Sequence, residues 1–180
     1  MALVVLLRGV NVGGHRRFRP SVLAHSLRRF EVVNIGAAGT FVVRRPGTRR
    51  EFRVALSRAL PLATDIVLFD GAELQQLEHI RPFGLEPVKR DVVRFVSFLP
   101  RRSRNDPSLP IQLPEGDEWL VRVVARRDRF VFGEYRRHMR TIGHLGQLDK
   151  LFGVPATTRN WNTVEAIVRV LGDRRGGRAP

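Results

Sequence analysis

Short apolar runs alternate with helically spaced apolar residues in the first third of the chain. Residues 2–8 consist almost entirely of alanine, leucine and valine, which is typical of a buried strand. Apolar residues recur at helical spacing from Phe18 to Phe30, and Val22 is among them. Pro20 suits the first turn of such a helix. The pattern therefore predicts a strand followed by an amphipathic helix.

Two β-rich runs come next, at residues 32–35 and 40–43, and the glycines between them predict a hairpin. Residues 52–60 have the spacing of a second amphipathic helix, which Pro61 would stop. Residues 65–69 then predict a strand. The resulting order, β-α-β-β-α-β, is the split βαβ or ferredoxin-like pattern.

The second half of the chain has weaker patterns and more proline. Asp70 and Glu73 have the spacing of a capping box, so we expect a helix that ends near Pro82. The further elements that the sequence predicts are a strand at residues 92–98, a mobile loop at 99–117, a hairpin at 119–132 turning at 126–128, and helices at 145–152 and 162–171.

These elements predict an α+β protein in four parts. The parts are a ferredoxin-like N-terminal subdomain at residues 1–80, a linker at 81–90, a C-terminal α+β subdomain at 91–172, and a disordered basic tail at 173–180. The second subdomain fits a degenerate repeat of the first, with its first helix replaced by the proline-rich loop. No residue-level repeat accompanies this interpretation.

Composition narrows the classes of function. Apolar residues make up 43% of the 180 residues, enough for a core, and the absence of cysteine excludes disulfides and thiolate zinc sites. No apolar run approaches the roughly 20 residues of a membrane span. The five histidines lack metal-ligand spacing, and neither a Walker loop nor a dinucleotide fingerprint occurs. We therefore expect a cytoplasmic protein with no metal, no cofactor and no membrane partner.

The formal net charge of +15 is the largest departure from average composition. It arises from 32 lysines and arginines against 17 acidic residues. Such a field attracts phosphates and polyanions. Two interpretations stay open: a solvated charged surface with incidental affinity for nucleic acid, and a nucleic-acid-binding or assembly module.

A glycine-rich segment joins the first strand to the first helix. It reads Leu-Arg-Gly-Val-Asn-Val-Gly-Gly over residues 7–14. Glycines there let backbone N–H groups point at a ligand, and the helix N-terminus adds partial positive charge. The alternative is a plain turn in which Arg8 pairs with an acid. The ligand-binding residues predicted from this segment are Arg8, Asn11, Gly13 and Gly14.

A second polar segment, residues 156–163, precedes the last predicted helix. Asn162 and Glu165 have the spacing of a helix cap, and Trp161 is expected to be structural. The remaining polar groups exceed what capping needs, and Arg159 could hold an anion. The alternative is a polar network that anchors the helix. The ligand-binding residues predicted here are Thr158, Arg159, Asn160 and Asn162.

Together the two segments resemble the family catalogued as domain of unknown function 1697. Its members open with Leu-Arg-Gly-Ile/Val-Asn-Val-Gly-Gly, matched by residues 7–14, and close with Gly-Val-Pro-Ala-Thr-Thr-Arg-Asn-Trp-Asn-Thr-Val, matched by residues 153–164. The family usually carries Gln-Ser-Gly-Asn-Val-Val-Phe where this chain has residues 37–43, so the polar groups are lost there. The resemblance implies a shared fold and bacterial relatives, and it implies no known reaction.

These observations lead to two hypotheses of function. The first is an anion or phosphate-ligand site formed between the glycine-rich segment and the Thr-Thr-Arg-Asn-Trp-Asn-Thr segment, in a protein whose enzymatic character the sequence leaves open. Its partner would be a small anionic or phosphorylated ligand. The alternative is a nucleic-acid-binding or assembly module driven by net positive charge, with non-specific binding.

Overall fold

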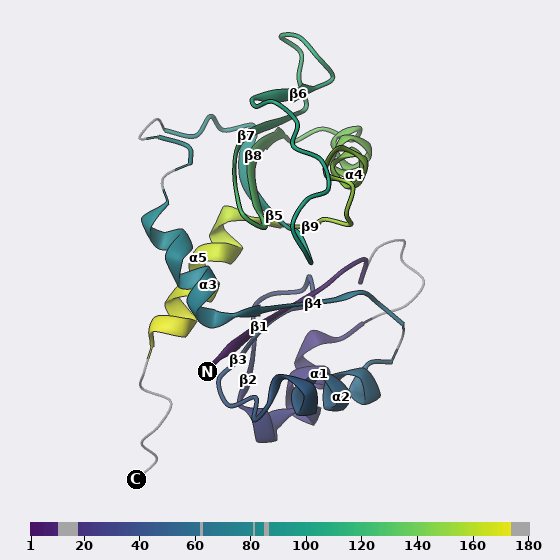
Figure 1. The fold of residues 1–180 in the computed structure, drawn as a ribbon, viewed down its shortest axis with the longest axis vertical. Coiled ribbons are helices and arrows are strands. Elements are labelled where there is room, and N and C mark those ends of the chain that lie inside the picture. Colours follow the sequence, from purple (N-terminus) through teal and green to yellow (C-terminus); the bar gives the residue numbers. More distant parts are fainter. Residues whose placement is uncertain (11–17, 62, 81, 85–86, 174–180) are drawn as a thin grey trace. The chain divides into compact units, whose positions relative to one another are not determined.

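The structure is a computed structural model that describes residues 1–10, 18–61, 63–80, 82–84 and 87–173 (Figure 1). It divides into two compact units. Unit 1 holds residues 1–79 and the chain from Glu165 on, and unit 2 holds residues 80–164. The sequence-based ranges 1–80 and 91–172 put the whole last helix in the second part, whereas most of that helix belongs to unit 1. The division into two subdomains joined by a linker at residues 81–90 stays a prediction.

Unit 1 contains a four-stranded sheet in the order β2-β3-β1-β4, with all neighbouring strands antiparallel. Its elements follow one another in the β-α-β-β-α-β order expected from the sequence. The strands are β1 (Leu3–Leu7), β2 (Val32–Asn34), β3 (Thr40–Val43) and β4 (Ile66–Asp70), and the two helices between them are α1 (Pro20–Ser26) and α2 (Arg49–Ala59).

One face of this sheet packs on α1, α2 and a 3-10 turn at Arg28–Phe30. The ring of Phe30 lies edge-on to that of Phe52, with 5.2 Å between the centroids. Val22 was expected on the apolar face but is 59% exposed. Leu23 and Leu27 define the buried stripe of the helix. Val22 precedes Leu23 by one position and therefore points about 100° away from that stripe around the helix axis.

The capping box predicted at the end of β4 is confirmed. The backbone N–H of Asp70 donates to the Glu73 carboxylate at 3.0 Å, and Asp70 caps in return. The helix is shorter than expected, because α3 (Gly71–Gln75) passes into a 3-10 turn at Gln76–His79 and does not reach Pro82. None of the helices in the described ranges is long and apolar enough to cross a membrane.

Unit 2 contains a five-stranded antiparallel sheet in the order β6-β7-β8-β5-β9. Its strands are β5 (Val92–Phe98), β6 (Ile111–Leu113), β7 (Val121–Arg127), β8 (Phe130–Arg136) and β9 (Thr157–Asn160), and its helix is α4 (Thr141–Phe152). Without β6, the order β7-β8-β5-β9 repeats β2-β3-β1-β4. The proline-rich segment follows β5 and precedes β7.

The sequence-based description of residues 99–117 as a mobile loop is wrong in part, because the segment contains β6. Its first half is also held against the end of α4. The Ser103 hydroxyl donates to the Phe152 carbonyl at 2.8 Å, and the Asn105 amide donates to the Leu151 carbonyl at 3.0 Å. Side-chain bonds to backbone carbonyls thus fix a segment that has no apolar periodicity.

The two faces of the second sheet differ in chemistry. One face packs on α4 through Phe95, Val123 and Val131 against Leu148 and Phe152. Because successive strand residues point to opposite faces, Arg94 and its cross-strand neighbours lie on the other face. The last helix, α5 (Trp161–Gly172), begins in unit 2 directly after β9.

Candidate functional site

Only part of the site predicted in the glycine-rich segment falls within the described residues. Arg8 follows β1, and its guanidinium lies 3.7 Å from the Asp65 carboxylate. The hydroxyl of Thr64 donates to the Arg8 carbonyl. Pairing of Arg8 with an acid, the alternative interpretation, is therefore observed. Asn11, Gly13 and Gly14 lie outside the described residues.

The second predicted segment folds into β9 and the start of α5. The hydroxyls of Thr158 and Ser97 lie 2.6 Å apart across β9 and β5. Arg159 is only 9% exposed, and its guanidinium donates to the Thr158 carbonyl at 2.8 Å. Burial lowers the pKa of Arg159 from its ordinary value to about 10.

The helix cap expected at Asn162 is wrong by two residues. Asn160 has that role, because its side-chain oxygen accepts from the backbone N–H and the hydroxyl of Thr163 at 2.8 and 2.7 Å. Asn162 is exposed on the first turn of α5. Trp161 is half-buried and packs edge-on to Phe83, with 5.4 Å between ring centroids, as expected for a structural residue. Capping and packing thus account for Asn160 and Trp161.

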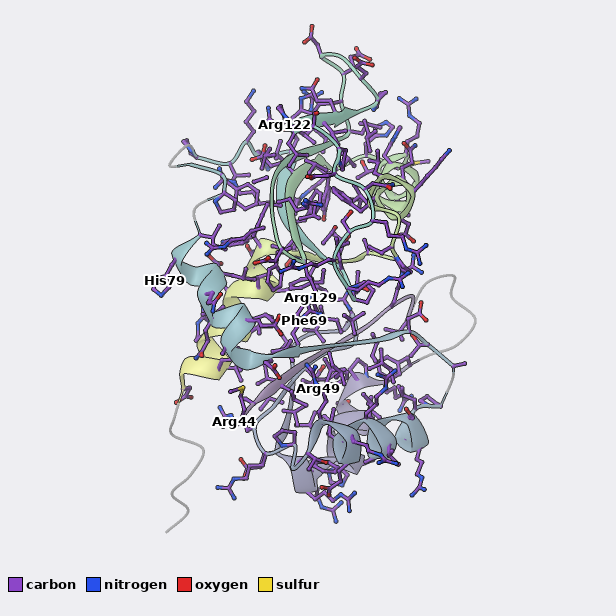
Figure 2. All side chains as sticks on the ribbon, in the orientation of Figure 1. Arg44, Arg49, Phe69, His79, Arg122 and Arg129 are labelled. Atoms are coloured by element: carbon purple, nitrogen blue, oxygen red, sulfur yellow. The ribbon has the colours of Figure 1, made fainter. Side chains whose placement is uncertain are left out.

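Sequence reasoning missed a pocket on the face of the second sheet opposite α4. Its volume is about 430 Å³, and part of its wall comes from the chain before β5, where Pro82, Phe83 and residues 87–89 line it together with Asp91. Figure 2 shows Arg122 on this part of unit 2. The lining residues are Pro82, Phe83, Pro87, Val88, Lys89, Asp91, Val92, Arg94, Trp119, Arg122, Val124, Glu134 and Arg136.

The floor of this pocket is a row of three charged side chains on adjacent strands. Glu134 on β8 is directly opposite Arg94 on β5 and Arg122 on β7. Its two carboxylate oxygens accept from the Arg94 Nε at 3.3 Å and from an Arg122 terminal nitrogen at 2.6 Å. The Glu134 side chain is 11% exposed. One buried carboxylate therefore orients two guanidiniums, which leaves one positive charge uncompensated within the row.

Aromatic rings hold these guanidiniums in place. Arg122 and Arg136 lie 4.8 and 4.6 Å from the centroid of the Trp119 ring. Arg94 lies 5.0 Å from the centroid of Phe83 and donates to its carbonyl at 3.5 Å. A stacked guanidinium keeps its N–H groups in its own plane, where they can donate to a carboxylate or phosphate. The stacking therefore prepares the arginines for an anionic ligand.

The formal charge of the pocket is positive. Its cations are Lys89, Arg94, Arg122 and Arg136, and its carboxylates are Asp91 and Glu134, so 4 − 2 leaves +2. The Nε atom of Arg122 is buried and has no hydrogen-bond partner. Within the described ranges no group of three or more histidine, aspartate or glutamate side chains could hold a metal ion. The charge and the donor set both favour an anion.

The comparisons with known proteins agree with the resemblance seen in the sequence. The profile of a family described as "Protein of unknown function (DUF1697)" matches residues 1–112, which is more than half of the 180 residues. The chain belongs to the DUF1697 family. The match includes the opening motif at residues 7–14 and Arg94, while the closing motif at residues 153–164 lies beyond it.

This DUF1697 protein is also similar to a solved structure, that of a conserved bacterial protein from Streptococcus pneumoniae. The TM-score is 0.59 at 13% sequence identity, over 94% of this chain and 98% of the other. At that identity the likeness establishes a shared fold. No curated protein matches the chain.

Proposed function

We propose that this DUF1697 protein binds a small anionic ligand in the pocket of unit 2. The observation that carries the proposal is the pocket's net charge of +2, from four cations and two carboxylates around about 430 Å³. A phosphate monoester is the best match, because its dianion would balance that charge and its oxygens accept from several guanidiniums at once. The volume leaves room for an organic group beside the phosphate.

Arg136 and Lys89 are the cations best suited to meet the ligand. Glu134 already engages Arg94 and Arg122, whereas the Arg136 guanidinium donates to the Asp117 carbonyl at 3.4 Å. The Lys89 side chain is exposed on the wall of the pocket. We assign the row of Arg94, Glu134 and Arg122 to positioning, and Arg136 and Lys89 to direct contact.

A thermal-shift screen against inorganic phosphate, nucleoside monophosphates, sugar phosphates and acyl phosphates tests the proposal. A ligand at 100 times its Kd should stabilise the folded state by about 2.7 kcal/mol. Arg136→Gln should abolish the shift, while Arg50→Gln on α2, an exposed arginine of unit 1, should keep it. If none of these ligands shifts the transition, or if both variants respond alike, the pocket is not an anion site.

The site predicted from the two motifs is a separate proposal, formed by Arg8, Asn11, Gly13, Gly14, Thr158, Arg159, Asn160 and Asn162. Its support is the sequence pattern and the buried guanidinium of Arg159 on β9. Arg159→Gln distinguishes it from the pocket, because this change should affect ligand binding only if the motif site is the one occupied.

We also propose that unit 1 is a ferredoxin-like domain and that unit 2 is a degenerate copy of it. The support is the shared strand order, β2-β3-β1-β4 and β7-β8-β5-β9, with a helix before the last strand in both. We place the protein in the cytoplasm. The second candidate function, nucleic-acid binding or assembly, rests on the net charge of +15 and predicts binding that weakens steeply with salt.

A further inference from the structure

Six arginines gather at the end of the second sheet that is remote from the pocket. Arg101, Arg102 and Arg104 lie in the loop after β5, and Arg126, Arg127 and Arg129 lie at the turn between β7 and β8. We call these six residues the arginine surface. β8 has seven residues, so its two ends are about 20 Å apart. Figure 2 shows Arg122 and Arg129 toward opposite ends of the hairpin.

Hydrogen bonds tie the two segments of this surface together. Arg129 donates to the Pro100 carbonyl at 3.1 Å, and Leu99 donates from its backbone to the Arg129 carbonyl at 2.9 Å. Arg126 reaches the Asp106 carboxylate at 2.6 Å and the Asn105 carbonyl at 3.2 Å. The loop and the hairpin turn therefore form one continuous surface whose shape is set before any partner binds.

The charge of the arginine surface is only partly compensated. Asp106 and Asp128 are the acids in the same two segments, so 6 − 2 leaves a formal charge of +4. Arg102 lies 3.9 Å from Asp128, yet its side chain is 86% exposed. Arg101, Arg104 and Arg127 are exposed as well. Their guanidiniums are open to a partner with regularly spaced anions.

We propose that the arginine surface binds the phosphate backbone of a nucleic-acid duplex, without reading sequence. This inference rests on the second candidate function, nucleic-acid binding, and it deepens that candidate by assigning the binding to a part of unit 2 other than the pocket. Single-stranded nucleic acid is usually held by stacking on aromatic side chains, and the surface contains none. Insertion into a lipid surface needs exposed apolar residues, and those of unit 2, Val88, Met139 and Ile142, lie outside the arginine surface. The exposed guanidinium groups of the arginine surface can donate hydrogen bonds to phosphate oxygens.

Fluorescence anisotropy with a labelled duplex of 20 base pairs, over a salt series, tests this proposal on the full chain. The test variant is R101Q/R104Q/R127Q. The matched control is R50Q/R53Q/R58Q on α2, which removes three exposed arginines of unit 1. Both lower the net charge from +15 to +12. Each phosphate contact contributes about −0.9 to the slope of log Kobs against log salt, so the test variant should lose about 2.7 of that slope.

We expect the test variant to bind about tenfold or more weakly at 100 mM salt, whereas the control keeps the wild-type slope. Arg136→Gln should leave duplex binding unchanged, which separates this proposal from the pocket. Equal losses in both triple variants would show that the whole field binds and not this surface. Tighter binding of a single strand, or binding of phosphatidylserine vesicles without binding of the duplex, would overturn the proposal as well. If the triple variant unfolds, Arg104→Gln alone should reduce the slope by about 0.9.

Discussion

Gly133 is required at its position because it sits under an aromatic ring beside the charged row. A Cβ atom there would collide with the Phe95 ring and would lie 2.5 Å from the Arg122 carbonyl oxygen. The backbone cannot yield without moving the strand that holds Arg122. We expect Gly133→Ala to lower the free energy of unfolding by about 1–3 kcal/mol or more, measured by urea denaturation. A loss below about 0.5 kcal/mol, which is typical of a substitution on the surface, would mean that β7 and β8 separate easily at Gly133.

Glu134 stabilises the pocket by holding two guanidiniums at once. Glu134→Gln keeps the shape of the side chain but leaves Arg94 and Arg122 facing each other without a carboxylate. We expect a loss of about 1–3 kcal/mol in the free energy of unfolding. Arg94 is only 18% exposed, so its unpaired charge is costly, whereas Arg122 is 38% exposed and solvent screens part of its charge.

Glu31→Gln is the matched control for this loss. Glu31 pairs with Arg45 at 3.0 Å, but the Arg45 side chain is 68% exposed. The control should therefore cost at most about 1 kcal/mol. Equal losses in the two variants would show that the row in the pocket is no stronger than a surface pair.

Arg159 gives a stability prediction whose sign follows from its pKa. Burial lowers that pKa from its ordinary value to about 10, so the unfolded state binds more protons above pH 10 and stability rises as the pH passes upward through 10. Below pH 10 the buried charge opposes folding. Arg159→Met should therefore raise the free energy of unfolding at pH 7. The gain should be at most about 3 kcal/mol, because the bond to the Thr158 carbonyl is also lost. A clear loss of stability in urea unfolding would show that the contacts of the guanidinium outweigh its desolvation.

At the scale of the element, α4 contains two glycines that no contact requires. Cβ atoms at Gly143 and Gly146 would meet nothing within 4 Å. Alanine loses less backbone entropy in a helix, so each Gly→Ala change should stabilise by about 0.5–1 kcal/mol. Gly153 ends the same helix with φ of 64° and lies close to Arg104, so Gly153→Ala should destabilise. Thermal unfolding of the three variants should show opposite signs.

Elements with a strong apolar pattern were predictable, and short polar strands were not. β1, β3 and β5 are apolar runs that bury nearly every side chain, so the sequence alone indicates them. β9 has the sequence Thr-Thr-Arg-Asn and exists because it pairs with β5, some 60 residues earlier in the chain. A strand made by a distant partner has no local signal.

The pocket was not predictable for a similar reason. Arg94 and Arg122 each have apolar neighbours on both sides in their strands, and Glu134 lies between a glycine and a tyrosine, which is a visible signal of a polar cluster. Which of them meet depends on the registers of β5, β8 and β7, and register is set by long-range pairing. The glycine-rich and Thr-Thr-Arg-Asn segments could be predicted as sites because each is a continuous stretch of sequence. In the described part of those segments, Asn160 caps a helix and Arg8 pairs with Asp65.

At the scale of the whole molecule, the two sheets share a four-strand order but differ in the connection that follows their first strand. In unit 1 the first connection is the helix α1, which buries apolar residues. In unit 2 the connection after the first strand, β5, is a loop held by side-chain hydrogen bonds, and it carries three arginines of the arginine surface. This polar loop exposes charged side chains, while α4 covers the core of unit 2.

Unit 1 is built from both ends of the chain, and this makes its stability depend on residues that follow unit 2. Ile167 on α5 is fully buried, and the Leu171 side chain lies where a Cβ on Gly71 would be 2.9 Å away. A chain that stops after Val164 loses these contacts, and a buried isoleucine alone is worth about 2–5 kcal/mol. We therefore expect faster amide hydrogen exchange in β1 and β4, with β7 and β8 much less affected. A chain that stops after Asp173 is the control and should exchange like the full chain. Two units that unfold separately confine the loss of stability to unit 1, which α5 completes. Two units that unfold cooperatively share that loss, so equally faster exchange in both sheets would show that they unfold as one.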